Sequence, residues 1–349
     1  MPLPNDDPSD FPPSLPQTPP PLPPRASKLR GAIVTVGLSL LYALLSRLAF
    51  AADFLQLYLG VVTLSYLGLM PVGFGALTTY LGYHYAGWRG GQLPAGSIGV
   101  VLLGFVLSAL LGLEAVFCLV VALPITVGMT AVGATGMKAI LERRDGRLYV
   151  TCLVLLPFVT APVERFWHRP PEIVTVENVV HVRATPEQVW REIVSVRAIP
   201  RDALPRKAIY LLNFPRPVAA TLTGTGVGSR RLATFERGVS FFEDVTLWEP
   251  GRRIAFTIRA DPAFIPHTAF DQHIIVGGRF FDVLDGTYEI EPLPGGAGCN
   301  LHLTSRHRLG TVFNFYASLW SRWVMGEIQD SILSVVVRRA ESSPAASAP

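Results

Sequence analysis

The sequence has few charged residues and few cysteines. Only 16% of its 349 residues are charged, half are hydrophobic, and the mean hydropathy is +0.37. A water-soluble chain has nearer a quarter charged residues, so this composition disfavours a wholly soluble protein. The three cysteines stand far apart, without the spacing of a zinc or redox site. We therefore expect neither a metal centre nor a disulfide framework.

Recognisable catalytic motifs are also lacking. The chain has no HExxH, no GxSxG nucleophile elbow and no Walker loop. Residues 224–228 are rich in glycine, but no helical pattern follows them, so they indicate a hairpin turn and not a phosphate-binding loop. No catalytic residue, cofactor or metal ligand is assigned. The net charge of +4 is divided equally before and after Val163, which gives little support for a nucleic-acid partner.

Proline is concentrated at the start of the chain. Residues 1–24 hold 11 of the 30 prolines. Proline fixes φ and removes a backbone donor, so this composition predicts a disordered tail over residues 1–29. A plain solvated tail is the simplest interpretation, and a ligand for a proline-binding protein partner is the alternative.

Long apolar segments follow the tail. They span residues 31–50, 55–83, 97–113, 115–137 and 148–163. A spanning helix needs about 20 predominantly apolar residues, and five such segments exceed what a soluble core needs. We predict a membrane region of about five helices over residues 30–165. The last segment is short, and it spans only if it includes Arg147 or Glu164, whose long side chains reach the interface.

The positions of the basic residues predict an orientation. By the positive-inside rule the N-terminus is cytoplasmic, and with five spans the C-terminal region lies outside. If the fifth helix does not span, that region stays in the cytoplasm. Glu114 is predicted to end a helical hairpin at the membrane surface; the alternative is a carboxylate at bilayer depth. The basic residues beside the spans are Arg25, Lys28, Arg30, Lys138, Arg143, Arg144 and Arg147.

The pattern changes after a linker over residues 166–174. Residues 178–184 alternate as a strand, and Thr185, Pro186 and Gln188 form the N-cap, first position and capping box of a helix. A final helix is predicted over residues 312–339, with apolar residues at helical spacing facing a sheet. This domain covers residues 175–340, before a disordered tail over 341–349. The six strands predicted between the two helices are 218–225, 229–237, 240–248, 253–259, 280–291 and 298–308.

These elements resemble a known superfamily. Residues 179–190 read Val-Val-His-Val-Arg-Ala-Thr-Pro-Glu-Gln-Val-Trp and residues 241–250 read Phe-Phe-Glu-Asp-Val-Thr-Leu-Trp-Glu-Pro. With the Trp- and Tyr-bearing final helix, they resemble the SRPBCC superfamily, which includes START-type lipid carriers and polyketide cyclase/dehydrase-like proteins. Residues 114–124 are similar to the anchor of bacterial multi-pass membrane proteins that carry such a domain.

The resemblance implies a fold, a ligand class and a location. The fold is an α+β helix-grip domain, in which a curved antiparallel sheet and a long C-terminal helix enclose a cavity for lipids, sterols or aromatic polyketides. The superfamily shares no catalytic motif, so no catalytic residue is carried over. The location implied is the bacterial inner membrane, and the positive-inside rule with five spans predicts that the domain lies on its periplasmic side.

Every second residue of a strand faces the interior of such a sheet. Glu243 is therefore on the same face as Phe241 and Val245. A carboxylate there either serves as an acid, base or polar-head ligand, or forms a salt bridge with Arg231 or Arg259. His273 is a candidate base, or else a solvated loop residue. The candidate cavity residues are Arg231, Phe241, Glu243, Val245, His273, Tyr288, Arg306 and Trp320.

Three functions are compatible with these features. The favoured one is non-catalytic binding of a lipid or other hydrophobic small molecule at the membrane, because an anchor and an apolar pocket pattern come without a nucleophile or metal set. The second is a cyclase- or dehydratase-type enzyme that uses Glu243 or His273 as acid or base. The third is a structural or sensory membrane protein. The partners expected are membrane lipids and the hydrophobic ligand.

Overall fold

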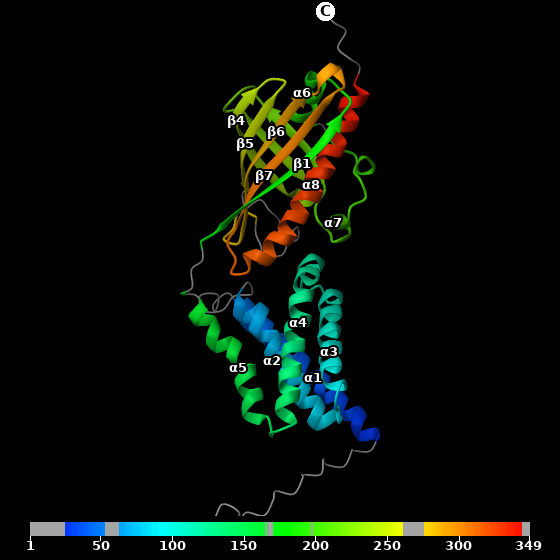
Figure 1. Cartoon of the computed structure of the whole chain (residues 1–349), viewed down its shortest axis with the longest axis vertical. Helices are drawn as coiled ribbons and strands as arrows, with labels where there is room; N and C mark the ends of the chain where they lie inside the picture. Colours follow the sequence, from blue (N-terminus) through cyan, green and yellow to red (C-terminus); the bar gives the residue numbers. More distant parts are fainter. Residues whose placement is uncertain are drawn as a thin grey trace, which may run out of the picture.

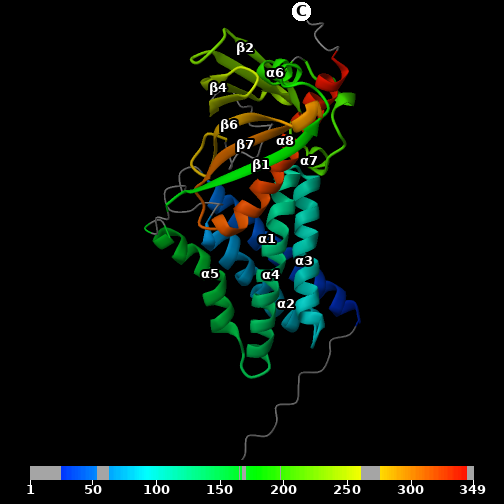
Figure 2. The same cartoon turned by 45° about the horizontal axis from the view of Figure 1, so that its top comes forward.

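The chain forms a helical bundle at one end and a sheet domain at the other (Figures 1 and 2). The computed structural model describes residues 25–52, 63–164, 166, 170–196, 198–260 and 276–343. The helices of the bundle come first in the chain, and the sheet domain follows the last of them. In both views the lower end of helix α8 lies next to the upper end of the bundle.

In the part of the chain that the structure describes, each predicted apolar segment forms a helix; residues 55–62 of the second segment lie outside that part. The second of them runs without a break from Ser65 to Ala86, with a π-helical stretch at either end. Helix α1 begins at Arg25, so residues 25–29 are helical and not part of the tail predicted for them. The bundle elements are α1 (Arg25–Ala51), η3 (Ser65–Leu69), α2 (Met70–Leu81), η4 (Gly82–Ala86), α3 (Gln92–Leu110), α4 (Val116–Leu141) and α5 (Arg147–Glu164).

Among the described residues, four helices are long and apolar enough to cross a membrane, where about five were predicted, and the second segment is not one of the four. They are Ser27–Ala51, Gln92–Leu110, Val116–Leu141 and Arg147–Glu164. The last includes both Arg147 and Glu164, as the length argument required.

Glycines let α2 pack closely against α4. A Cβ atom on Gly133 would lie 2.0 Å from the carbonyl oxygen of Val72, and one on Gly75 would lie 2.2 Å from that of Thr130. The two backbones are therefore in direct contact. Small residues at helix interfaces permit this approach in membranes, where burial of apolar surface gives little driving force. A hydroxyl pair connects α2 to α3 in the same interior, where Thr79 Oγ1 and Ser97 Oγ lie 2.9 Å apart.

Two glutamates form polar contacts at the end of the bundle nearest the sheet domain. Glu114 lies in the turn between α3 and α4 and forms an ion pair with Arg47 of α1. The hairpin predicted at Glu114 is thus present. Glu164, at the end of α5, accepts hydrogen bonds from the backbone N–H groups of Leu64 and Ser65, at 2.5 and 2.9 Å. These donors start a helix and have no partner within it, so the carboxylate supplies a helix cap from another helix.

The sheet domain holds seven antiparallel strands in the order β1-β7-β6-β5-β4-β3-β2. Strand β1 begins at Glu172, inside the segment predicted as linker, and all six later strands lie within a few residues of their predicted bounds. The strands are β1 (Glu172–Val182), β2 (Pro217–Thr223), β3 (Arg230–Phe235), β4 (Ser240–Glu249), β5 (Arg253–Ala260), β6 (Phe281–Pro292) and β7 (Cys299–Leu309).

Helices α6 (Pro186–Val194) and α8 (Asn314–Ser342) cover one face of the sheet. The capping box of α6 is confirmed: the Gln188 N–H donates to Thr185 Oγ1 and the Thr185 N–H donates to Gln188 Oε1. Helix α8 ends at Ser342, so residues 341–342 are helical and not part of the tail predicted for 341–349. Short helices η5 (Arg201–Ala203) and α7 (Ala208–Leu211) connect α6 to β2.

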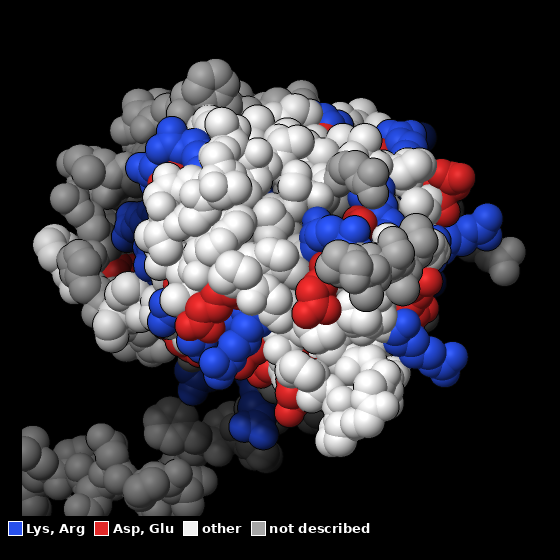
Figure 3. All heavy atoms as spheres, turned by 90° about the horizontal axis from the view of Figure 1, so that it is seen from above, with Lys and Arg blue, Asp and Glu red and all other residues white. Residues whose placement is uncertain are grey.

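The core between the sheet and α8 is apolar. It includes Ile254, Ile290 and Leu301 from the sheet and Leu333 from α8, all fully buried. Seen from above (Figure 3), the end of the domain away from the bundle is largely uncharged at its centre. Figure 3 shows that face, where lysine and arginine side chains alternate with aspartate and glutamate around the rim of an uncharged area. No broad field of one sign appears on it.

The bundle and the sheet domain are joined by direct contacts as well as by the chain. The Tyr316 hydroxyl of α8 donates to the carbonyl oxygen of Val121 in α4 at 2.5 Å. The rings of Phe117, also in α4, and Phe214 pack edge to face with centroids 4.8 Å apart. The first turns of α4 are therefore part of the surface against which the sheet domain rests.

The glycine packing makes a matched prediction within α4. We expect Gly133→Ala to destabilise the bundle by about 1–3 kcal/mol, because its Cβ atom would overlap the Val72 backbone. Gly136→Ala is the control, since no atom lies within 4 Å of the Cβ position there, and alanine favours a helix over glycine. Thermal unfolding of the detergent-solubilised full chain measures both, and equal midpoints for the two variants would contradict the packing described.

Candidate functional site

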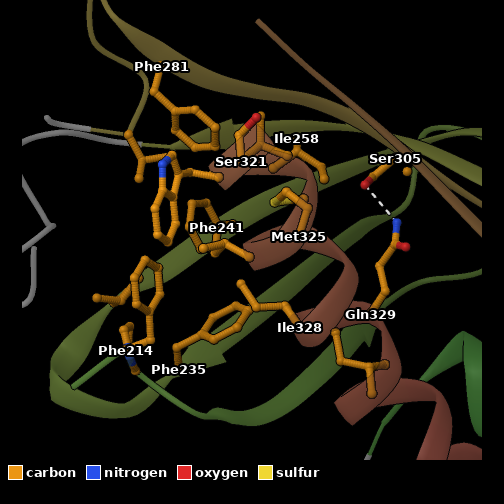
Figure 4. Close-up of a pocket in the computed structure, with 18 of the residues that line it drawn as sticks. Phe214, Phe235, Phe241, Ile258, Phe281, Ser305, Ser321, Met325, Ile328 and Gln329 are labelled. Carbon is orange, nitrogen blue, oxygen red and sulfur yellow. Dashed lines mark hydrogen bonds between the residues drawn. The ribbon is translucent and has the colours of Figure 1, made fainter. Parts of the chain in front are cut away.

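An apolar cavity of about 290 Å³ lies between the sheet and α8, in the half of the domain nearest the bundle. This volume is close to the lower end of the range typical of small-molecule sites, about 300–1,000 Å³. In Figure 4 aromatic rings from the strands face aliphatic side chains of α8 across the space. The apolar lining includes Phe235, Phe241, Ile258, Phe281, Val324, Met325, Ile328 and Ile332.

Helix α4 completes the cavity wall. Phe117, Cys118 and Val121 line the cavity together with Phe214, which follows α7. The contacts that join the two parts of the molecule, Phe117 with Phe214 and Tyr316 with Val121, are at this same place. The sheet domain therefore does not enclose the cavity alone.

A buried ion pair lies in the wall formed by β3 and β4. Arg231 and Glu243 are directly opposite in the strand register, and Arg231 Nε donates to a carboxylate oxygen of Glu243. Their side chains are only 4% and 8% exposed. A buried charge is tolerated when it is paired and its remaining donors are bonded. A second donor of Arg231 is bonded as well, because its Nη1 donates to the carbonyl oxygen of Ile193 at 2.6 Å.

Aromatic rings enclose this ion pair. The guanidinium carbon of Arg231 lies 4.5 Å from the ring centroid of Phe256 and 5.7 Å from that of Tyr288. Burial disfavours the charged guanidinium, but the Glu243 carboxylate and the Tyr288 hydroxyl together outweigh that effect and hold the pKa of Arg231 above its ordinary value. Burial also raises the pKa of the Tyr288 hydroxyl. This wall therefore holds the Arg231–Glu243 ion pair beside a neutral phenol.

A second group of polar contacts connects β7 and α8. Gln329 Nε2 donates to Ser305 Oγ at 2.8 Å, the contact drawn in Figure 4, and to the Val176 carbonyl oxygen at 3.1 Å. His307 Nε2 lies 2.8 Å from Ser321 Oγ. His307 is fully buried, and desolvation, with a smaller effect from the Arg322 charge, lowers its pKa to about 4. This histidine is neutral at pH 7.

The structure places most of the predicted site residues together. Arg231, Phe241, Glu243, Tyr288 and Trp320 all line the cavity. The Glu243 carboxylate is bonded to Arg231, which is the salt-bridge alternative for this residue, and Arg259 pairs instead with Asp244. The enzyme hypothesis needed a Glu243 carboxylate without an arginine partner, and the ion pair does not meet that condition.

Two predicted residues do not line the cavity. Val245 is buried in the neighbouring core, on the expected face of β4 but among the packed residues. Arg306 was wrongly expected inside; its side chain is 57% exposed and binds Asp285 on the outer face of the sheet. Neighbouring residues of β7 face opposite sides, so Ser305 and His307 point inward and Arg306 outward. His273 lies outside the described residues.

The sequence reasoning missed the contribution of α4 and the two serine contacts. Phe117 and Cys118 stand in an apolar segment that reads only as membrane helix, and no sequence pattern links them to a domain that follows much later in the chain. Ser321 could be found in part, because it shares a face of its helix with residues predicted to face the sheet. Ser305 could not, because it is the neighbour of Arg306, and expecting Arg306 inside placed Ser305 on the outer face. Among the described residues, no three His, Cys, Asp or Glu side chains cluster as a metal site.

Comparisons with known proteins leave the family open. Neither a family model nor a curated protein matches the sequence. Similar solved structures include a protein from Chromobacterium violaceum, with 17% identity over 49% of this chain and 99% of that one and a TM-score of 0.29. A protein from Thermus thermophilus has 19% identity over 49% and 100% of the two chains, with a TM-score of 0.31.

A truncated norcoclaurine synthase from Thalictrum flavum has 12% identity over 48% of this chain and 96% of that one, with a TM-score of 0.29. At these TM-scores the likenesses carry no argument, and the fold rests on the strand order and helices described above.

The buried ion pair makes a stability prediction. Arg231→Met leaves the Glu243 carboxylate buried and unpaired, so we expect a loss of about 3–5 kcal/mol in the free energy of unfolding. Replacing both residues, Arg231→Met with Glu243→Leu, is expected to regain most of that loss. The exposed neighbour Arg230→Met, whose partner is Asp244, is the control and should cost about 0–1 kcal/mol. A double variant as unstable as the single one would contradict this account.

His307 makes a pH prediction. Its pKa is about 4 in the folded protein against 6.5 in the unfolded chain, so between these values the unfolded chain binds a proton that the native state excludes. The free energy of unfolding therefore falls as the pH is lowered from about 6.5 to about 4, by about 3 kcal/mol from this group. The midpoint of thermal unfolding should therefore depend less on pH across that range in His307→Asn than in the wild type. His181→Asn, at an exposed position, is the control. The same pH dependence of the unfolding midpoint in all three proteins would contradict the role given to His307.

Proposed function

We propose that the chain is a membrane-anchored binding protein that holds a neutral, hydrophobic small molecule, such as a lipid, in the cavity between its sheet and α8. The observation that carries the proposal is the composition of the cavity wall. Aromatic and aliphatic side chains from five strands and α8 form most of it, and an apolar helix of spanning length, α4, completes it. A cavity built in this way fits an occupant that is itself soluble in a bilayer.

The charges of the cavity favour a neutral occupant. Arg231 and Glu243 are the only charged side chains among the described residues that line it, and each neutralises the other. A bound carboxylate or phosphate would add an uncompensated charge at low dielectric, which is costly. The Tyr288 hydroxyl and the line from Ser305 to Gln329 offer hydrogen bonds to a hydroxyl or carbonyl group. An apolar molecule with one neutral polar group therefore matches the wall.

The distribution of basic residues supports an orientation. Gly31 packs against Tyr85 at the end of the bundle away from the sheet domain, so the N-terminus and the turn after η4 are at that end. Arg89 and the basic turn between α4 and α5, with Arg143 and Arg144, lie there too. At the domain end, Arg47 is paired with Glu114. By the positive-inside rule, the far end is cytoplasmic and the sheet domain extracytoplasmic, as in a bacterial inner-membrane protein.

The element order supports membership of the SRPBCC superfamily with a helix-grip fold. A strand and a capped helix open the domain, six antiparallel strands follow, and the long helix α8 closes it. This is the arrangement that the resemblance of residues 179–190 and 241–250 implies. The superfamily binds hydrophobic molecules between sheet and helix, which is the space occupied by the present cavity.

Binding is tested on the detergent-purified full chain with radiolabelled oleyl alcohol and oleate, which differ only in the polar end. We expect the alcohol to bind and the acid to bind about tenfold more weakly, or about 1.4 kcal/mol. Glu243→Gln should reduce this preference, because it leaves the Arg231 charge free to pair with the acid. Retention of each probe after gel filtration measures binding.

Matched variants test whether the cavity itself is the site. Ile328→Trp places a larger ring in the cavity and should abolish binding of the alcohol, whereas Val227→Trp, on an exposed hairpin, should leave it unchanged. Thermal unfolding of both variants establishes that they remain folded. Absence of binding by either probe to the folded wild type would contradict the proposed function for ligands of this class.

A further inference from the structure

The first turns of α8 reach alongside a membrane helix. The Tyr316 hydroxyl donates to the carbonyl oxygen of Val121, which is the sixth residue of α4. At a rise of 1.5 Å per residue, Val121 lies about 8 Å along the helix from its start. All of α4, Val116–Leu141, belongs to a segment long and apolar enough to cross a membrane. The start of α8 is therefore level with the outer part of that segment and not above it.

The side chains around Tyr316 are apolar and unusually exposed. Phe315 is 72% exposed and Leu319 is 64% exposed. They are four residues apart, so they lie on one face of α8. The cavity-lining Ala317 and Ser321 are on the opposite face, which means that Phe315 and Leu319 point away from the sheet. On a surface in water this pair would remain unburied.

The aromatic residues of the same turns match the interfacial zone of a bilayer. The rings of Tyr316, Trp320 and Trp323 follow one another along α8, with centroids 6.2 and 6.1 Å apart. Tyrosine and tryptophan are enriched where membrane helices meet water, because their rings are apolar and carry one polar group. The three rings are partly buried and stand on the side of the helix between the exposed pair and the cavity face, and Trp320 also lines the cavity.

We propose that the first two turns of α8, Asn314 to Ser321, are inserted into the bilayer interface and form one lip of the cavity, opposite the first turns of α4. The inference rests on the proposed function in one respect, namely that α4 spans the membrane. It adds that the cavity opens at the level of the lipid chains, since Phe117, Cys118 and Val121 line it from within the spanning segment. A membrane-dissolved molecule then enters the cavity from the side without crossing water.

Site-directed nitroxide labelling of the full chain in phosphatidylcholine and phosphatidylglycerol vesicles tests this insertion. A single cysteine is placed at Phe315 or Leu319 in a chain in which Cys118 and Cys152 are alanine; the third cysteine, Cys299, is fully buried. Collision rates with oxygen, which concentrates in the bilayer, and with a water-soluble nickel chelate then report depth. We expect labels at both sites to collide preferentially with oxygen.

Two control sites separate the possible failures. Val227, on the hairpin between β2 and β3, is 66% exposed and lies far from the bundle, so a label there should prefer the nickel chelate. Val106, in α3 near its domain end and 55% exposed, should prefer oxygen if the helices span. Labels at Phe315 and Leu319 that behave like Val227 while Val106 prefers oxygen would overturn the insertion of α8 and leave the anchor intact. A Val106 label that prefers the chelate would overturn the membrane anchor, and with it the proposed function.

Discussion

The half of the sheet domain nearest the helices depends on α4 for part of its wall. The sheet and α8 diverge at that end, and the interior that they leave is closed by Phe117, Cys118 and Val121 of the bundle. The edge-to-face contact of Phe117 with Phe214 and the Tyr316 hydrogen bond hold this closure in place. The two parts of the chain therefore form one site, and neither encloses an apolar molecule without the other.

The opposite wall of the cavity contains charged side chains. There a buried arginine and glutamate satisfy one another across two adjacent strands, surrounded by aromatic rings. Such a pair contributes little net stability relative to apolar residues, but it requires both members to be present. It also sets the electrostatics of the space, since the charges of the described lining residues cancel. The cavity is therefore apolar at the bundle end and carries a balanced ion pair in this wall.

Much of this could be predicted from the sequence, because the signals are local. Five apolar segments almost without charges specify five helices, and Thr185, Pro186 and Gln188 specify the start of α6 through contacts within four residues. The inward face of β4 followed from strand alternation, which placed Glu243 beside Phe241. Alternation failed for Arg306 because the register of β7 relative to the cavity was unknown, and a shift of one residue reverses every side chain.

The wall supplied by α4 was outside the reach of local reasoning. Phe117 and Phe214 are far apart in the sequence, and an apolar residue in a membrane helix has the same sequence pattern whether it faces lipid, a neighbouring helix or a cavity. The same is true of the glycines that bring α2 and α4 together, since Gly133 and Gly136 differ only in what lies opposite them. Tertiary contact, and not composition, distinguishes these positions.

The carboxylate of Glu164 fixes the point at which the chain leaves the bundle. It ends α5, and its oxygens bind the N–H groups that begin the second helix of the bundle. The Ser65 hydroxyl donates to the same carboxylate. The last turn of α5 is therefore anchored to a neighbouring helix by three hydrogen bonds, so a charge-removing substitution there would release both helix ends at once.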